Sequence, residues 1–276
     1  MSEKYRPTRF WESSHAAVTA EKVRAGIGMR HVGGGESDAE AAALYRLRGA
    51  NASRVLRKCS LPANPRIMEL GSGGGYWVEF FRQLDPEIFV GSDLSMTAVE
   101  RLSSRYPDYK FVCMLETEQA WSRIQSLGPY DLSLAIDVLY HITDDKTWED
   151  ALNHLCANVA ASGLLLIADY FYEQPAERQS QTHVKHRKLQ DYLDVLDKHG
   201  FEVEQVQPVF YFLNRIISGP WRDHAKLYSP ILRLLTSNFV GLRLIGMVDG
   251  VVTAFARPMN PKCKTRFLLA RREARV

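Results

Sequence analysis

Residues 67–77 read IMELGSGGGYW, and this stretch decides the fold of the chain. Four glycines fill five positions, 71–75, directly behind the short apolar run of residues 66–70. Glycine loses more backbone entropy on folding than any other residue, so the cluster requires a reason. Three interpretations are open here: a flexible loop, a cradle for a nucleotide phosphate, or a turn that brings backbone close to another ligand.

An alternation of strands and helices surrounds this loop. Strands are expected at residues 66–70, 88–93, 109–115, 130–137, 163–171 and 201–209, and helices at 76–84, 95–106, 118–128, 147–159 and 186–200. Such an alternation predicts a parallel sheet covered on both faces, and right-handed crossovers make it a doubly wound α/β fold.

The flanking segments have a different character. Two helices are expected at residues 13–30 and 37–58, joined by a glycine-rich hinge, and a strand, an Asp-Gly turn and a final strand are expected over 242–258. The predicted organisation is a helical cap or lid (1–60), the main α/β domain (61–257) with a helical insertion (208–247), and a solvated basic tail (258–276).

Composition narrows the class of protein. The chain has 276 residues, 46% hydrophobic and 24% charged, with a net charge of +3, which is too small for a general nucleic-acid binder. Its four cysteines form no CxxC pair, so no zinc site is expected. With no secretory signal and no apolar run near the roughly 18 residues of a membrane span, we expect a cytoplasmic protein without a membrane partner. A homodimer is left open.

The spacing of the glycines in this loop distinguishes between the possible ligands. Gly71, Gly73 and Gly75 form GxGxG behind Glu69, not the GxGxxG of a dinucleotide site. A carboxylate repels a pyrophosphate and attracts a cation. Asp93 ends the next strand, 18 residues beyond Gly75, where a carboxylate accepts hydrogen bonds from a ribose diol. A ribose with a cationic centre describes S-adenosylmethionine.

Four motifs together carry a family resemblance. ELGSGGG (69–75), GSDLS (91–95), YDLSLAIDVLYHI (130–142) and SGLLLIADY (162–170) occur in order. Over about residues 64–207 plus the final strand, the chain resembles the class I S-adenosylmethionine-dependent methyltransferases. The resemblance implies a Rossmann-like, seven-stranded, mostly parallel sheet with an antiparallel last strand.

The resemblance also implies roles by position. Glu69 would lie near the methionine amino group, Asp93 would hold the ribose, and Leu94 or Met96 would contact the adenine. The residues implied for the glycine loop and the methionine side are Gly71, Ser72, Gly73, Gly75, Asp137, Val138 and Leu139.

Several of these positions have a second interpretation. The family often has an acidic residue after strand three, whereas here Leu115 stands there and Glu116 follows; either Glu116 or the backbone of both residues contacts the adenine. Gly74 and Gly75 would alternatively permit close packing of helix and strand, and Asp93 or Ser95 would cap the next helix. For Glu69 and Asp93 we favour the cofactor interpretation.

Methyl transfer from a sulfonium requires alignment and exclusion of water, and an alcohol or phenol acceptor benefits from a general base. His141, after the fourth strand, is the first candidate for that base, and a structural histidine that orients the loop is its alternative. Tyr140 would line the substrate or pack under the sheet, and Asp169 would hydrogen-bond the acceptor. No metal is expected, because His183 and His186 have no third ligand nearby.

Aromatic residues in the flanking segments are expected to wall the acceptor pocket. They are Tyr5, Phe10 and Trp11 in the first segment, where they would form a lid, and Tyr211, Phe212, Trp221 and Tyr228 in the second. We therefore expect methyl transfer to an oxygen, in preference to a nitrogen, of a small molecule such as a sugar or specialised metabolite. The alternatives are an RNA or protein methyltransferase, although no basic stripe supports RNA, and a non-catalytic S-adenosylmethionine-binding protein.

Overall fold

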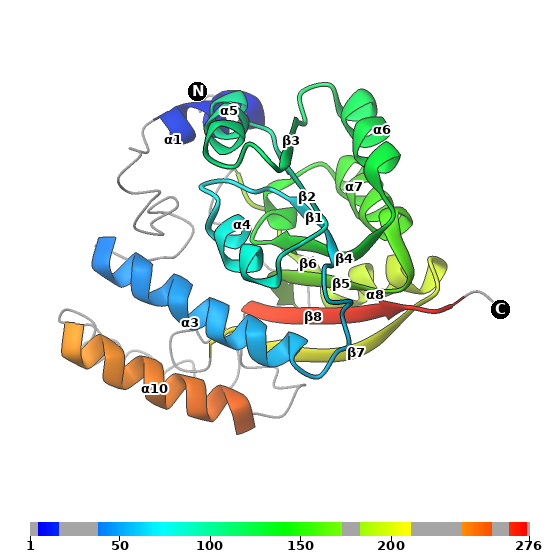
Figure 1. Cartoon of the computed structure of the whole chain (residues 1–276). Helices are drawn as coiled ribbons and strands as arrows, with labels where there is room; N and C mark the ends of the chain where they lie inside the picture. Colours follow the sequence, from blue (N-terminus) through cyan, green and yellow to red (C-terminus); the bar gives the residue numbers. More distant parts are fainter. Residues whose placement is uncertain (1–4, 17–37, 173–182, 211–238, 256–264, 275–276) are drawn as a thin grey trace.

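The protein is an α/β sandwich built on one mixed sheet, shown by the computed structural model in Figure 1. The structure describes residues 5–16, 38–172, 183–210, 239–255 and 265–274. Seven strands follow one another in the order β3-β2-β1-β4-β5-β8-β7, and a short β6 pairs with β5. The strands are β1 Arg66–Leu70, β2 Ile88–Asp93, β3 Lys110–Cys113, β4 Tyr130–Ile136, β5 Val159–Tyr172, β6 Arg187–Lys188, β7 Phe201–Pro208 and β8 Thr265–Arg272.

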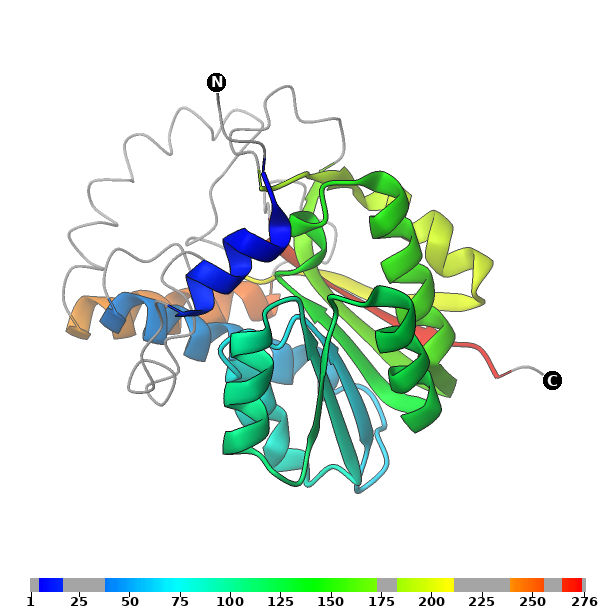
Figure 2. The ribbon, with the colours of Figure 1, turned by 90° about the horizontal axis from the view of Figure 1, so that it is seen from above.

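Helices cover both faces of this sheet (Figure 2). They are α1 Pro7–Ala16, α3 Asp38–Leu56, α4 Tyr76–Phe81, α5 Met96–Arg105, α6 Thr117–Leu127, α7 Asp145–Asn158, α8 Leu189–Lys198 and α10 Phe239–Phe255, with short 3-10 turns η1 Arg82–Leu84 and η2 Leu139–His141. The strand–helix alternation over residues 66–209 and the helix expected at 37–58 are therefore confirmed. The antiparallel last strand is confirmed as well, because β8 runs antiparallel to both β5 and β7.

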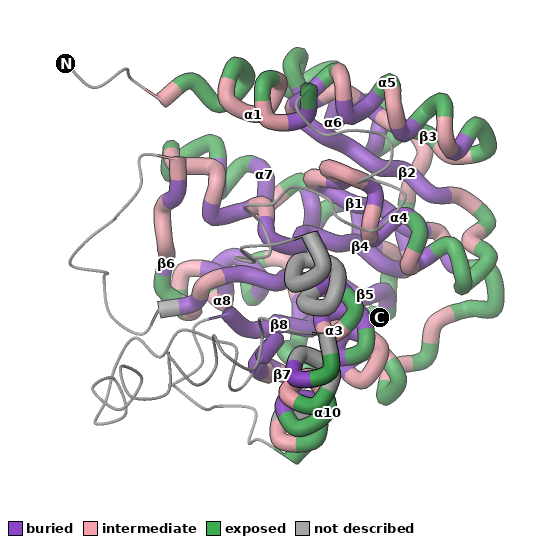
Figure 3. The backbone as a smooth tube through the Cα atoms, turned by 90° about the vertical axis from the view of Figure 1, so that its left-hand side faces the viewer, coloured by how far each residue is buried: buried purple, intermediate pink, exposed green. Residues whose placement is uncertain are grey.

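The pleat of the strands divides the interior into two cores. Successive side chains of a strand point to opposite faces. Ile67 and Phe89 thus pack with α3, α4 and α5, whereas Met68 and Val90 pack with α6, α7 and α8. The central strands β1, β2 and β4 are buried along nearly their whole length, as the purple tube in Figure 3 shows. This rigid frame presents the carboxyl ends of β1, β2 and β4 at one edge.

Two expectations near the end of the chain are wrong. The predicted hairpin over 242–258 is instead α10, which packs along α3. Its β-branched residues and Asp249-Gly250 pair imitate a hairpin, but tertiary packing on α3 overrides them. The predicted last strand is instead β8, within the segment expected to be a solvated tail. Its first six residues are buried, because it lies between β5 and β7.

Only part of the predicted N-terminal region lies among the described residues. The helix expected at 13–30 begins earlier, as α1, and the rest of that range lies outside the described residues, as does the glycine-rich hinge. Most of the 208–247 insertion, with Tyr211, Phe212, Trp221 and Tyr228, also lies outside them. No helix in the described ranges combines the length and apolarity that crossing a membrane requires.

Candidate active site

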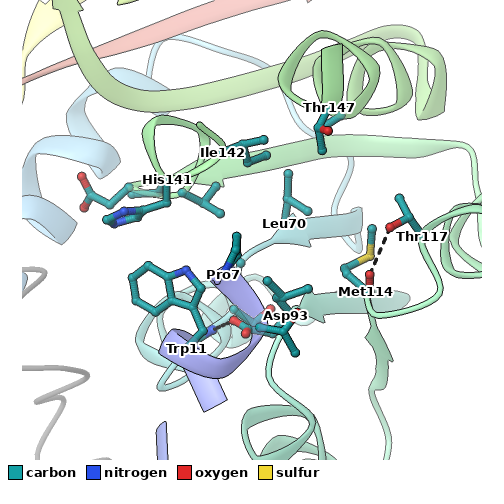
Figure 4. Close-up of a pocket in the computed structure, with 18 of the residues that line it drawn as sticks. Pro7, Trp11, Leu70, Asp93, Met114, Thr117, His141, Ile142 and Thr147 are labelled. Atoms are coloured by element: carbon teal, nitrogen blue, oxygen red, sulfur yellow. Dashed lines mark hydrogen bonds between the residues drawn. The ribbon is translucent and has the colours of Figure 1, made fainter. Parts of the chain in front are cut away.

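A cavity of about 870 Å³ opens at the carboxyl edge of the sheet. Its walls come from the loops after β1, β2, β3 and β4, from residues of α3, α4, α6 and α7, and from α1, whose Pro7 and Trp11 lie beside the other lining side chains (Figure 4). Trp11 and His141 lie at one end of the labelled set, and Met114 and Thr117 lie at the other. The predicted site residues that line the cavity are Gly71, Ser72, Gly73, Asp93, Leu94, Leu115, Asp137, Val138 and His141.

The glycine loop forms a tight turn tied to the neighbouring strand. The backbone amides of Gly71 and Ser72 both donate to the carbonyl of Ser92, at 2.8 and 2.9 Å. Gly71 has φ +78°, and a Cβ there would lie 2.6 Å from Cγ2 of Val138. The loop therefore needs glycine for its conformation and for the close approach of the loop after β4.

Gly75 has a structural role instead. It is the N-cap of α4 with φ +81°, and a Cβ there would lie 2.5 Å from Cδ2 of Leu102 in α5. It is not among the residues that line the cavity. This is a packing role, as weighed from the sequence, but the element that Gly75 approaches is helix α5 and not a strand.

Glu69 is a buried carboxyl beside the glycine loop. Only 1% of its surface is exposed, and its Oε2 has no hydrogen-bond partner among the described residues. Burial raises the pKa of Glu69 to about 8, and Ser72 beside it offsets this only in part. The group does not line the cavity itself, but its unpartnered oxygen suits a cationic ligand bound over the loop.

Asp93 ties the glycine loop to the turn that begins α5. Its Oδ2 accepts from the amide of Gly73 at 2.8 Å, and its Oδ1 accepts from the amide of Ser95 at 2.9 Å. The hydroxyl of Ser95, not Asp93, caps α5 by accepting from the amide of Ala98. A carboxylate offers about four lone-pair sites, so Asp93 still has capacity for hydroxyl groups of a ligand in the cavity.

The segments after β2 and β3 carry an apolar part of the wall. Leu94, Met114 and Leu115 line the cavity, whereas Glu116 stands at the N-cap of α6 and does not. The acidic residue of this region that does line the cavity is Glu118, which sequence reasoning missed. A flat apolar ring would fit between these side chains.

Met96 and Leu139, also predicted as cofactor contacts, do not line the cavity. Met96 is 41% exposed at the start of α5, and Leu139 is fully buried in the hydrophobic core. Both positions follow a strand end by a few residues, where the turn of the chain decides which side chain faces the site. The sequence motif alone does not fix that turn.

His141 is held in one orientation and one tautomer. Its Nδ1 lies 3.0 Å from the carbonyl oxygen of His183, which can only accept, so Nδ1 carries the proton. Nε2 of the neutral ring then keeps its lone pair. Burial, with the nearby His183 and His186, lowers the pKa of His141 to about 4. The ring is therefore a neutral hydrogen-bond acceptor near pH 7.

The other two predicted catalytic residues lie outside the cavity lining. Tyr140 is buried and packs edge-on against Tyr170, with ring centroids 4.8 Å apart. Asp169 is fully buried in β5; it accepts from the hydroxyl of Tyr192 and from the amide of Tyr170, both at 2.5 Å. Burial raises the pKa of Asp169 to about 7. Because its side chain points toward α8, it does not reach the site.

A buried ion pair that sequence reasoning missed supports the loop after β4. Arg48 of α3 pairs with Asp137, and both side chains are nearly inaccessible. Asp137 has φ +57°, an uncommon conformation for a residue other than glycine, and its Oδ1 has no hydrogen-bond partner among the described residues. Burial raises the pKa of Asp137, and the guanidinium of Arg48 opposes this rise.

Helix α1 closes the site through its aromatic residues. The ring of Trp11 packs edge-on against His141, with centroids 4.6 Å apart, and Phe10 stacks on His183 at 4.9 Å. Glu12 fixes the helix by accepting from the hydroxyl of Ser95 at 2.8 Å. Sequence reasoning found the aromatic residues but not Glu12, because its partners lie far away in the chain.

Comparison with known proteins gives a family match. A family model described as a methyltransferase domain matches residues 43–206, more than half of the chain. A comparison with curated protein sequences finds no match.

Solved structures give the fold. The magnesium protoporphyrin IX methyltransferase ChlM from Synechocystis PCC 6803, with bound S-adenosylmethionine, has a TM-score of 0.53 at 12% identity, covering 99% of this chain and 100% of that one. The [4+2]-cyclase SpnF has a TM-score of 0.53 at 15% identity over 96% of both chains. The O-methyltransferase from a trans-AT PKS multienzyme of Brevibacillus brevis has a TM-score of 0.51 at 13% identity, covering 82% and 72%.

Proposed function

The chain belongs to the class I S-adenosylmethionine-dependent methyltransferases, and on this premise we propose that it methylates an oxygen atom of a small molecule, with His141 as the general base. The single observation that carries the proposal is the hydrogen bond between Nδ1 of His141 and the carbonyl of His183. It leaves Nε2 as a lone pair fixed at the cavity, which is the arrangement that removes a proton from a hydroxyl group.

The cofactor half of the cavity is built from the loops after β1 and β2. In our proposal, the backbone of Gly71 and Gly73 cradles S-adenosylmethionine, Asp93 holds its ribose, and the buried carboxyl of Glu69 attracts its cationic end. When bound, this cofactor supplies an activated methyl group. The unpartnered Oε2 of Glu69 supports the fit, because a cation bound nearby compensates the burial of the carboxylate.

The acceptor half lies near His141 and Trp11. Helix α1 covers this end, so the acceptor reaches the base only within a walled space of limited volume. A cavity of about 870 Å³ lies in the upper part of the range of small-molecule sites, roughly 300–1,000 Å³. These dimensions favour a small acceptor beside the cofactor, and the aromatic wall of Trp11 favours one with an apolar or flat part.

The choice of oxygen follows from the chemistry of the base. An alcohol or phenol must lose its proton as the new bond forms, so a fixed acceptor nitrogen accelerates its methylation. A neutral amine attacks without that assistance. Burial lowers the pKa of His141 to about 4, so the ring is unprotonated at neutral pH, but the same shift makes it a weaker base than an ordinary imidazole.

The test is an acceptor screen. The protein is incubated with S-adenosylmethionine and matched pairs of small molecules that differ only in carrying a hydroxyl or an amino group, with tRNA as a further arm. Release of S-adenosylhomocysteine identifies substrates, and mass spectrometry of the product locates the methyl group. We expect O-methylated small molecules; methylation confined to amines or to RNA would refute the proposal.

A further inference from the structure

His15, in the last turn of α1, is part of the cofactor half of the cavity. It lines the cavity and is only 1% exposed. Its Nε2 lies 3.8 Å from Oδ1 of Asp93, and a Cβ at position 73 would lie 3.7 Å from its Cε1. The imidazole ring therefore lies against both the glycine loop and the carboxylate at the end of β2.

The backbone of α1 is fixed at this place by contacts that do not involve the imidazole. Glu12 accepts from the amide of Thr97 at 3.2 Å, in addition to the hydroxyl of Ser95. One turn later, the guanidinium of Arg101 donates to the carbonyl of His15 at 3.0 Å. Helix α1 is thus docked on the start of α5, and the position of the ring follows from that docking.

The second ring nitrogen of His15, Nδ1, is not the one that faces Asp93. Nδ1 of His15 is buried and has no hydrogen-bond partner within the described part of the chain. A buried polar atom without a partner is unusual in a native protein and points to a ligand that supplies one. The ring lines the cavity, so a molecule bound there is the candidate partner for this nitrogen.

The tautomer determines what this nitrogen can bind. The carboxylate of Asp93 favours a proton on the facing Nε2, which leaves a lone pair on Nδ1. A lone pair accepts a hydrogen bond from a hydroxyl group and repels a carboxylate. Burial lowers the pKa of His15, although Asp93 acts in the opposite direction, so the neutral ring is favoured.

We propose that His15 is a cofactor-binding residue whose Nδ1 accepts a hydrogen bond from a ribose hydroxyl of S-adenosylmethionine, beside Asp93. The two residues then hold the ribose diol from two elements, β2 and α1. The inference rests on cofactor binding, which the proposed function also requires, but it does not depend on the acceptor or on His141. It also explains why α1 is docked on α5: the docking delivers the second ribose contact.

The test is calorimetric titration with S-adenosylhomocysteine and with 5′-methylthioadenosine, which keeps the adenosine and lacks the amino-acid end. His15→Ala is expected to weaken both ligands by a similar factor, about five- to tenfold, as for one lost hydrogen bond. His15→Asn, whose amide lies near the place of Nδ1, is expected to restore most of the affinity. His15→Gln, which reaches the place of Nε2, is expected to restore less.

His199→Ala is the matched control, because His199 bonds Asn153 at the end of α8, away from the cavity. Its affinities are expected to equal those of the wild type. Unchanged affinity of His15→Ala for both ligands would overturn the proposal. A loss confined to S-adenosylhomocysteine would place the contact at the amino-acid end and would also overturn it. Failure to methylate any hydroxyl acceptor would refute the proposed function and leave these affinities unaffected.

Discussion

Nδ1 of His141 donates a hydrogen bond to the carbonyl oxygen of His183 over 3.0 Å. The bond joins the turn after β4 to the segment that precedes β6, and Trp11 of α1 packs against the same imidazole ring. Three segments that are distant in sequence thereby fix the orientation of one imidazole ring that lines the cavity. The predictions below test this arrangement and the groups that surround it.

The first prediction concerns acidification. The pKa of His141 is lowered to about 4 from its ordinary 6.5, because the ring is buried. Between these values the unfolded chain binds a proton at this residue and the folded protein does not, so stability falls as the pH falls from about 6.5 to 4. Urea unfolding should show that the wild type loses up to roughly 3 kcal/mol more than His141→Asn across this window. Equal losses would contradict the low pKa.

The second prediction concerns Glu69. Its pKa of about 8 means that the carboxyl of the free protein is mostly protonated at pH 7. A bound cation favours the carboxylate, so binding of S-adenosylmethionine should expel up to about one proton. Calorimetry at pH 7 in buffers of different ionisation enthalpy measures this release. The isosteric Glu69→Gln variant should not release this proton. If both proteins release the same number of protons, the proton comes from another group.

The third prediction separates ligand binding from helix capping at the end of β2. Asp93→Ala should weaken cofactor binding about 10- to 100-fold, because charge-assisted hydrogen bonds are lost. Ser95→Ala removes the cap of α5 and one hydrogen bond to Glu12, so it should lower the free energy of unfolding by about 1–2 kcal/mol. Its loss of affinity should be smaller than that of Asp93→Ala, because Thr97 still holds Glu12. Isothermal calorimetry and urea unfolding give the two quantities. If Asp93→Ala binds the cofactor with wild-type affinity, the role of Asp93 is limited to accepting hydrogen bonds from the amides of Gly73 and Ser95.

The fourth prediction concerns the buried pair of Arg48 and Asp137. Arg48→Met leaves the Asp137 carboxyl buried and unpaired, so we expect a loss of roughly 3–5 kcal/mol in the free energy of unfolding. The double variant Arg48→Met/Asp137→Leu should be more stable than the sum of the single changes implies. Urea unfolding of the three variants completes the cycle. Strict additivity would show that the two side chains do not depend on each other.

The central part of the fold could be predicted because each step of it is local. Apolar runs such as residues 66–70, a glycine turn and an amphipathic helix recur in order, and right-handed crossovers then fix the sheet. The end of the chain could not be predicted in this way. Residues 267–270 form a short apolar run between arginines, and only burial between β5 and β7 makes it part of a strand.

Residues that line the cavity could be predicted where they end a strand or directly follow one, at the carboxyl edge of the sheet. Asp93, Val138 and His141 are of this kind. Residues that reach the site from other elements left a weaker signal. Arg48 shares a helical face with the buried Asn51, three residues on, and this polar stripe within a core face was the available clue. His15 and Glu12 left no local signal, because their partners lie in β2 and α5.

The most direct test of the central claim is single-turnover methylation of a hydroxyl acceptor from the screen by the wild type, His141→Ala and His141→Asn, with cofactor affinity measured in parallel. We predict a fall in the methylation rate of about 10²- to 10⁴-fold in both variants, largest for acceptors of high pKa and smallest for phenols that are already ionised, at wild-type cofactor affinity. Undiminished turnover in both variants would contradict the account.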